Sequence, residues 1–247
     1  MTAERGTMSS ILLAMLATVL FLVAGGVSFF SDFPWLSALV TGIFALLLPF
    51  LVTFLSKEEK RENSEAKKSG FALLWLLPLF VGVTFSLSLF CQWIGAFFDI
   101  TLPTYTGALP FLLFAHALIP AVTEEFCFRG VLPRLLSPLG KGAELWGAAI
   151  LFAIAHVSPV MMCYALVAGL FLGLVREYTK APYLSMVFHF VNNGFCLVLM
   201  QFPSVSPVLA AGLVLGLGVV LLGAVYLKNP KLLKDFLAPL RQKKETR

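Results

Sequence analysis

The sequence contains little charge. Asp, Glu, Lys and Arg together make up 13% of the 247 residues, whereas about 25% is usual for a soluble domain. Hydrophobic side chains make up 59%, which excludes an ordinary soluble enzyme or a disordered scaffold. The nearly unbroken apolar run from Leu12 to Phe30 also lacks the alternation of outer-membrane barrel strands. The scarcity of charge therefore predicts a membrane protein built from helices.

The sequence patterns of several common sites are also missing. There is no C-x-x-C pair, and the chain has neither an H-E-x-x-H zinc motif nor a G-x-S-x-G nucleophile turn. No basic patch is interleaved with exposed aromatic residues, so we expect no nucleic-acid partner. The four cysteines are far apart inside apolar segments, which predicts buried packing residues and no disulfide framework. They are Cys91, Cys127, Cys163 and Cys196.

The chain is instead divided into eight apolar runs, each long enough to cross a bilayer or nearly so. We therefore expect an all-α fold, a polytopic membrane helix bundle of about eight transmembrane helices, forming one integral membrane domain over residues 1–247. The first run is predicted to be a retained span, because its apolar core is longer than that of a signal peptide and its start is not basic. The runs lie at about 9–30, 35–55, 71–98, 107–136, 142–157, 159–175, 182–200 and 207–227.

All 18 Lys and Arg residues fall on one side of this eight-span arrangement. They occur in the N-terminal tail, in the connectors after the second, fourth and sixth runs, and after the eighth run. Because cytoplasmic loops carry the excess of basic residues, both termini are predicted to be cytoplasmic. The basic tail at 228–247 interleaves Leu232 and Phe236 with lysines, which predicts an amphipathic helix lying on an anionic membrane leaflet.

A few polar side chains interrupt the apolar runs, and an ionisable residue inside a span is by default a functional hypothesis. At a rise of about 1.5 Å per residue, Glu124 and His156 both lie roughly 18 Å from the cytoplasmic ends of their helices, and His189 roughly 10 to 14 Å. Their similar depths predict one shared intramembrane cavity. The polar set is His116, Glu124, Glu125, Arg129, His156, His189, Asn192 and Asn193.

Spacing within the helices adds a second constraint. Glu125 and Arg129, and likewise His189 and Asn193, are four residues apart and so share a helix face. A carboxylate beside an imidazole can deprotonate water, and a second imidazole with an amide can stabilise the oxyanion formed when that water attacks a carbonyl. Peptide hydrolysis inside the membrane is therefore a candidate function.

Each of these side chains also has a structural interpretation. Glu125 and Arg129 are about as consistent with an ion pair that stabilises one helix as with a direct part in chemistry. His116 lies two turns before Glu124 and is interpreted as a packing residue, and Asn192 lies off the His189 face and is interpreted in the same way. Two other functions stay open, a proton-coupled transporter, which would also use buried Glu and His, and a non-catalytic membrane scaffold or immunity protein.

Three ordered motifs carry a family resemblance. Glu124 to Gly130 reads EEFCFRG, Phe152 to His156 reads FAIAH, and His189 to Asn193 reads HFVNN. Together they resemble the E-E-x-x-x-R, F-x-x-x-H and H-x-x-x-N motifs of the CAAX-protease and bacteriocin-processing (CPBP) family. This family includes prenyl endopeptidases and lysostaphin-resistance-like membrane proteins. The resemblance covers roughly residues 107–200, and no motif residue departs from the pattern.

The resemblance implies an intramembrane endopeptidase. It assigns Glu124 as the base that activates water with the help of His156, His189 and Asn193 as the oxyanion-stabilising pair, and Glu125 with Arg129 as supporting residues. The family has been described both as metalloproteases and as glutamate-dependent proteases. Because the paired Asn193 suits an oxyanion better than a metal, we favour the glutamate mechanism, with a zinc ion on Glu124, His156 and His189 as the alternative.

The partners follow from the same reasoning. We expect a hydrophobic or lipidated peptide or protein as substrate and the lipid bilayer as solvent. The expected location is the plasma membrane of a prokaryote, as a multi-pass protein. A prenylated C-terminal peptide is the substrate of one branch of the family, and the sequence does not distinguish it from a hydrophobic leader or a sorting-signal helix.

Overall fold

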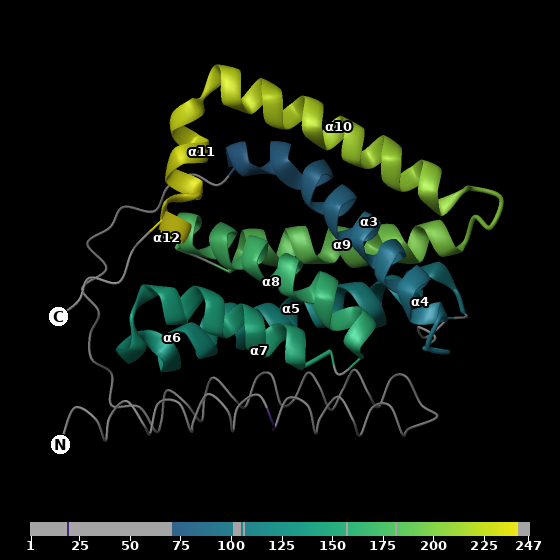
Figure 1. Cartoon of the computed structure of the whole chain (residues 1–247), viewed down its shortest axis with the longest axis horizontal. Coiled ribbons are helices and arrows are strands. Elements are labelled where there is room, and N and C mark those ends of the chain that lie inside the picture. The colour runs from purple at the N-terminus through teal and green to yellow at the C-terminus, as the bar shows by residue number, and fades with distance from the viewer. Residues whose placement is uncertain are drawn as a thin grey trace.

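A computed structural model of the chain describes residues 71–100, 105, 107–156, 158–180 and 182–241, together with Val19. Within these ranges the chain forms helices and no strand, which confirms the predicted all-α membrane bundle (Figure 1). Apart from Val19, the predicted runs at 9–30 and 35–55 lie outside the described residues. The retained first span and the full count of eight therefore stay predictions.

Most helical segments join end to end into longer helices. The first runs through η1 (Phe71–Leu76) and α3 (Leu77–Ala96). The second is continuous over Leu109–Leu139 and comprises α4 (Leu109–Leu113), η2 (Phe114–Leu118), α5 (Ile119–Glu125), η3 (Phe126–Val131), α6 (Leu132–Leu136) and η4 (Ser137–Leu139). After it come η5 (Ala143–Gly147), α7 (Ala148–Ile154), α8 (Pro159–Thr179), α9 (Tyr183–Met200), α10 (Pro207–Lys228), α11 (Pro230–Phe236) and α12 (Ala238–Arg241).

Five of these helices are long and apolar enough to cross a membrane: Phe71–Ala96, Leu109–Leu139, Pro159–Thr179, Tyr183–Met200 and Pro207–Lys228. The protein is therefore an integral membrane protein. The run predicted at 142–157 is different, because its helix covers only Ala143–Ile154, roughly 18 Å at the helical rise. That is too short for a hydrocarbon core of about 30 Å. The helix ends early because the chain turns at His156 and restarts at Pro159.

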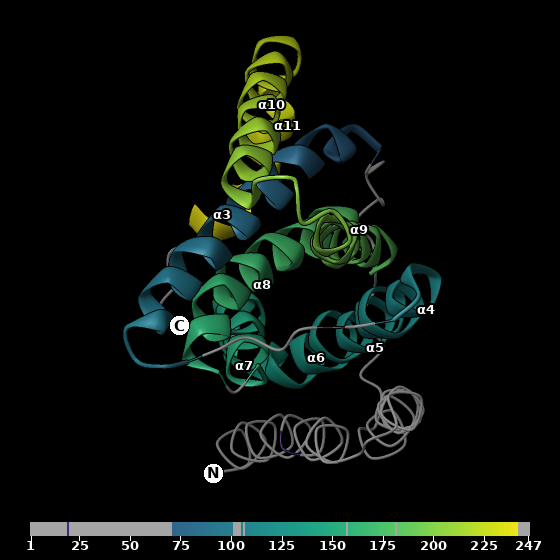
Figure 2. The ribbon, with the colours of Figure 1, turned by 90° about the vertical axis from the view of Figure 1, so that its right-hand side faces the viewer.

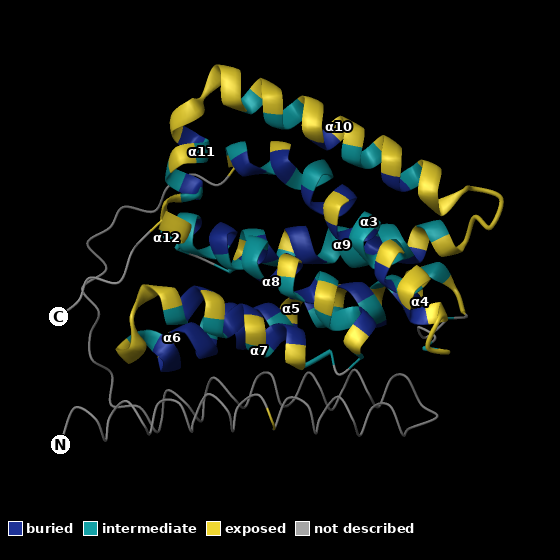
Figure 3. Ribbon diagram, in the orientation of Figure 1, coloured by how far each residue is buried: buried dark blue, intermediate teal, exposed yellow. Residues whose placement is uncertain are grey.

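Helices α3 and α10 pack unusually closely. A Cβ atom added at Gly82 would lie 2.6 Å from the Cα of Leu215, and one at Gly218 would meet the backbone of Leu79. Small residues allow membrane helices to approach in this way. The rest of α10 exposes apolar side chains along its outer surface (Figure 3), as a lipid-facing helix does.

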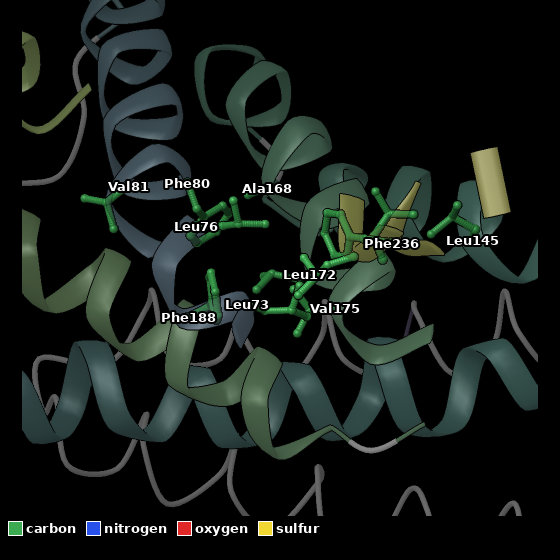
Figure 4. Close-up of a cluster of buried hydrophobic side chains, with 12 residues drawn as sticks. Leu73, Leu76, Phe80, Val81, Leu145, Ala168, Leu172, Val175, Phe188 and Phe236 are labelled. Atoms are coloured by element: carbon green, nitrogen blue, oxygen red, sulfur yellow. The ribbon is translucent and has the colours of Figure 1, made fainter. Parts of the chain in front are cut away.

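The largest cluster of buried hydrophobic side chains in the described residues joins η1, α3, η5, α8, α9 and α11 (Figure 4). Phe80 stacks on Phe171 with ring centroids 4.7 Å apart, and Phe171 contacts Phe236 of α11 at 5.5 Å. The tail helix is thus present, but its apolar side is covered by protein. Leu232 and Phe236 are only 4% and 3% exposed, so the prediction that this side lies on the lipid leaflet is wrong. Phe236 instead packs on Phe171 and Tyr178 of α8.

One of the four cysteines also differs from its prediction. Cys91 and Cys127 are buried and Cys196 is half-buried, whereas Cys163 is exposed on the surface of α8. All four are free thiols. An exposed thiol is compatible with this surface because lipid, like the protein interior, is apolar.

The basic side chains gather at one end of the bundle, which we call the basic end. It contains the connectors between α6 and α7 and between α8 and α9, together with α11 and α12 (Figure 1). Lys141 of the first connector contacts Glu177 near the end of α8 at 3.4 Å. The opposite end contains the turn between α9 and α10 and the start of α4. In the described ranges, the basic residues at the basic end are Arg134, Lys141, Arg176, Lys180, Lys228, Lys231, Lys234 and Arg241.

Candidate active site

Glu125 and Arg129 form a fully buried ion pair. Nη1 of Arg129 lies 3.0 Å from Oε1 of Glu125, and the side chains are 2% and 0% exposed. Nη2 of Arg129 donates to the carbonyl of Gly169 at 3.1 Å, and the guanidinium stands 4.3 Å above the ring of Phe152. Three segments, α5 with η3, α7 and α8, therefore meet at one charge pair. The predicted pairing along one helix face is present, and its partners extend well beyond that helix.

His189 connects this pair to the second glutamate. Its Nδ1 lies 2.9 Å from Oε1 of Glu125. A carboxylate that is ion-paired to Arg129 accepts hydrogen bonds, so Nδ1 of His189 is the donor. The other ring nitrogen, Nε2, faces Oε2 of Glu124 at 3.7 Å. The imidazole is thereby held in one orientation between the two carboxylates.

Glu124 is oriented differently from its neighbour. Its side chain is 18% exposed and lines a cavity. Within the part of the chain that the structure describes, its buried Oε2 has no hydrogen-bond partner. The 3.7 Å gap to His189 is too long for a direct hydrogen bond. It leaves room for a water placed beside the two atoms at the usual distance of about 2.8 Å.

His156 follows the C-terminal end of α7. Its Nδ1 lies 2.9 Å from the carbonyl oxygen of Phe152. A carbonyl can only accept, so Nδ1 carries the proton and Nε2 of the neutral ring is left as an acceptor. The imidazole packs edge to face on the Phe152 ring at 4.8 Å and lines the same cavity as Glu124.

A proline accounts for the position of Asn193. Pro120 has no N–H, so it cannot form the helical bond to the carbonyl of His116 four residues earlier. Nδ2 of Asn193 donates to that carbonyl at 3.4 Å. Nδ2 of Asn192 donates to Oδ1 of Asn193 at 3.4 Å, and the hydroxyl of Thr84 lies 2.6 Å from Oδ1 of Asn192. The Asn193 amide is therefore oriented from both sides, by the His116 carbonyl of η2 and, through Asn192, by Thr84 of α3.

The cavity that these residues share has a volume of about 550 Å³. Its polar residues include Glu124, His156, His189 and Asn193, and the remaining wall is largely apolar. The apolar side chains come mainly from α3, α8 and α9. They include Phe80, Phe85, Leu89, Met161, Leu172, Leu197 and Met200.

The structure thus brings all four predicted catalytic residues onto one cavity, with Glu125 and Arg129 buried behind them. Sequence reasoning missed Tyr105 and Tyr164, which also line the cavity. Tyr105 lies in a connector with no periodic pattern, so no sequence signal pointed to it. Burial and the nearby Glu124 carboxylate raise the pKa of Tyr105, which keeps its hydroxyl protonated.

The two residues interpreted as packing residues also belong to this wall. His116 lines the cavity and its ring lies 4.1 Å from that of Tyr105. Asn192 lines the cavity too, beside Asn193. Both residues therefore make the expected packing contacts and in addition line the cavity.

The zinc alternative requires Glu124, His156 and His189 to converge on one ion. Both histidines present Nε2 with Nδ1 bonded to an acceptor, which is the usual arrangement of a metal-binding imidazole. Among the described residues, however, no three His, Cys, Asp or Glu side chains converge to hold a metal ion. His156 therefore does not join Glu124 and His189 in one ligand set. The three residues do not fit a zinc site in this arrangement, and we derive no step through a metal.

The fold and the site define a class, an integral membrane helix bundle with a glutamate and histidine site inside the membrane. Residues 106–195 match the family model of type II CAAX prenyl endopeptidase Rce1-like proteins and are an Rce1-like domain, which confirms the predicted family. The match covers somewhat more than a third of the chain and includes all three motifs. The family is one of proteases. No curated protein sequence and no solved structure matches the chain significantly.

Proposed function

We propose that the chain is an intramembrane endopeptidase that hydrolyses peptide bonds with a water activated by Glu124 and His156. The observation that carries this proposal is the buried Oε2 of Glu124, which lacks a hydrogen-bond partner within the described residues and faces a cavity beside His189. A carboxylate oxygen in this position is available to take a proton from water. The substrate class is a hydrophobic or lipidated polypeptide, because the cavity wall is largely apolar.

The reaction begins when the ionised Glu124 takes one proton from the water and the water oxygen bonds to the carbonyl carbon. Nε2 of His156 accepts a hydrogen bond from the same water and orients it. The carbonyl oxygen becomes an oxyanion. The proton held by Glu124 then passes to the leaving nitrogen, the C–N bond breaks, and the products are a carboxylic acid and an amine.

His189 and Asn193 stabilise the oxyanion in this scheme. Nδ2 of Asn193 makes only a long 3.4 Å bond to His116 and can donate to a substrate oxygen. His189 donates through Nε2 when both its nitrogens are protonated. Its Nδ1 already donates to Glu125, which fixes the ring so that Nε2 faces the cavity side of the site.

The decisive experiment compares wild-type protein with Glu124→Gln. The amide keeps the shape of the side chain and cannot accept the proton, so cleavage should fall by a factor of about 10² to 10⁴. The measurement is the set of N- and C-terminal peptides of membrane proteins from cells carrying either form. Termini that are present only with the wild type identify substrates.

Glu177→Gln is the matched control. It makes the same chemical change at the basic end, where Glu177 pairs with Lys141 and Lys180, and it should retain cleavage. A Glu124→Gln protein that is folded, membrane-inserted and as active as wild type would overturn the catalytic assignment. A transporter or a scaffold would give identical termini with both forms.

A further inference from the structure

The cavity is asymmetric along the bundle. On α9, which starts at the basic end, the lining residues begin at His189 and continue to Met200. On α8, which runs in the opposite direction, they extend from Met161 to Leu172 and stop about two turns before the basic end at Thr179. The cavity therefore occupies the half of the bundle remote from the basic end.

Fully buried side chains close the cavity toward the basic end. Phe188 precedes His189 by one residue and is 0% exposed, and Val175 follows Leu172 by about one turn and is also 0% exposed. Phe128 follows Glu124 by about one turn in the direction of the basic end and is also 0% exposed. These residues belong to the two largest buried hydrophobic clusters. A polypeptide cannot reach Glu124 from the basic end without unpacking these clusters.

The exposed part of the described lining lies at the opposite end. The exposed residues of the described cavity lining all lie between positions 200 and 207, in the turn from α9 to α10. Figure 2 looks onto this end, and α5, α7, α8 and α9 are arranged around the region that the cavity occupies. We call this exposed part of the lining the mouth. Its exposed residues are Met200, Phe202, Pro203, Val205 and Pro207.

We infer that substrate enters through this mouth, and hence from the extracytoplasmic side of the membrane. This inference rests on the proposed function and on the distribution of Lys and Arg, which places the basic end in the cytoplasm. The substrate class is then a polypeptide segment on or near the extracytoplasmic surface, such as part of an exported or membrane-anchored protein. A cytosolic C-terminus would face the closed end.

The lining also limits the chemistry of that segment. Among the described lining residues there is no Lys or Arg, and Glu124 is the sole carboxylate. A charged side chain next to the cleaved bond would therefore find no partner in this lining other than Glu124, the proposed base, and its burial there would be unfavourable. Residues flanking the cleaved bond should be uncharged and mainly apolar.

Thiol labelling of intact cells tests the direction of entry. Phe202→Cys and Val205→Cys place a thiol at the mouth, where the native side chains are 53% and 40% exposed. Leu139→Cys is the matched control at the basic end, where Leu139 is 38% exposed. Each is made in a background with Cys163→Ala and Cys196→Ala, because Cys163 is exposed and Cys196 is half-buried in the cavity wall.

A negatively charged, membrane-impermeant maleimide should label the two mouth cysteines in intact cells and label the Leu139→Cys protein only after permeabilisation. Labelling of the Leu139→Cys protein in intact cells, with the mouth cysteines protected, would overturn the inference. This measurement needs no activity, so it is independent of whether the proposed protease function is right.

The comparison of peptide termini gives a second readout. Termini that require Glu124 should map to extracytoplasmic segments of their proteins and have uncharged flanking residues. If they map to cytoplasmic segments, the direction of entry is wrong and the proposed hydrolysis stands. If no termini depend on Glu124, the proposed function is wrong, and the labelling pattern still decides which end of the bundle faces outward.

Discussion

Oε1 of Glu125 and Nδ1 of His189 lie 2.9 Å apart, although 64 residues separate them in the chain. The same carboxylate oxygen contacts Arg129 at 3.0 Å. Glu125 therefore joins a cation on its own helix to an imidazole on α9. The two interpretations of Glu125 and Arg129, a structural ion pair and a part in chemistry, therefore do not exclude each other. The ion pair itself orients a histidine that lines the cavity.

The Glu125–Arg129 pair should be important for stability. Arg129→Met leaves the Glu125 carboxylate buried without its main partner, which should reduce the free energy of unfolding by about 3 to 5 kcal/mol. The double variant Glu125→Gln with Arg129→Met should lose less than the two single changes added together. Unfolding in detergent micelles, followed by circular dichroism, measures both.

Lys141→Ala supplies the control for that experiment. Lys141 is paired with Glu177 and is 50% exposed, so its loss should cost at most about 1 kcal/mol. If Arg129→Met and Lys141→Ala reduced the free energy of unfolding equally, the buried pair would stabilise the fold no more than the exposed pair does.

Asn193 should contribute to the rate of cleavage. Removal of one oxyanion donor usually lowers kcat by a factor of about 10² to 10³, and Asn193→Ala is expected to fall in this range with KM little changed. Asn192→Ala should have a smaller effect, because Asn192 acts by orienting Asn193 through the 3.4 Å bond between their amides. Steady-state kinetics on a cleaved peptide identified from the terminal-peptide comparison would measure both. An Asn193→Ala enzyme with wild-type kcat would contradict the oxyanion role.

Chelation distinguishes the glutamate mechanism from the zinc alternative. The three proposed ligands do not converge in the structure, so purified protein should keep its activity after exhaustive treatment with a chelator. Elemental analysis of the same sample should find less than stoichiometric zinc. Loss of activity that returns on addition of zinc, and of no other divalent ion, would establish the metal mechanism instead.

The close contact between α3 and α10 should be sensitive to a single branched side chain. Gly82→Val would push a Cβ to within 2.6 Å of the Leu215 backbone, and such overpacking typically costs about 1 to 3 kcal/mol. Gly216→Val on α10 is the control, since a Cβ there has nothing within 4 Å. Thermal unfolding in detergent compares the two proteins. A similar melting temperature for both would show that the close packing is not needed.

Much of the site could be predicted because the membrane makes polar residues conspicuous. Glu124, His156, His189 and Asn193 were selected from sequence by depth and helical spacing, and the structure places all four on one cavity. Glu125 and Arg129 were paired correctly because a spacing of four residues sets neighbours on a helix. These are local rules, and they hold whatever the neighbouring helices do.

Other features depended on contacts between distant segments. The apolar side of α11 was assigned to lipid, and it packs on Phe171 because an aromatic surface of α8 lies beside it. His116 supplies the carbonyl that Asn193 uses, which follows from the absence of an N–H at Pro120 and the approach of α9. Hydropathy cannot separate lipid from protein as the cover of an apolar surface, since both are apolar.

By itself the sequence determined that this is a helical membrane protein, which residues interrupt its apolar runs, and which family motifs they form. The scarcity of charge makes each of those residues visible. Only the tertiary structure decided that His189 lies between the two glutamates, that the helix ending near His156 is too short to cross the membrane, and that the exposed part of the described cavity lining lies at the end remote from the basic residues. Those outcomes depend on how helices pack against one another, and packing is set by the shapes of side chains that are distant in the chain.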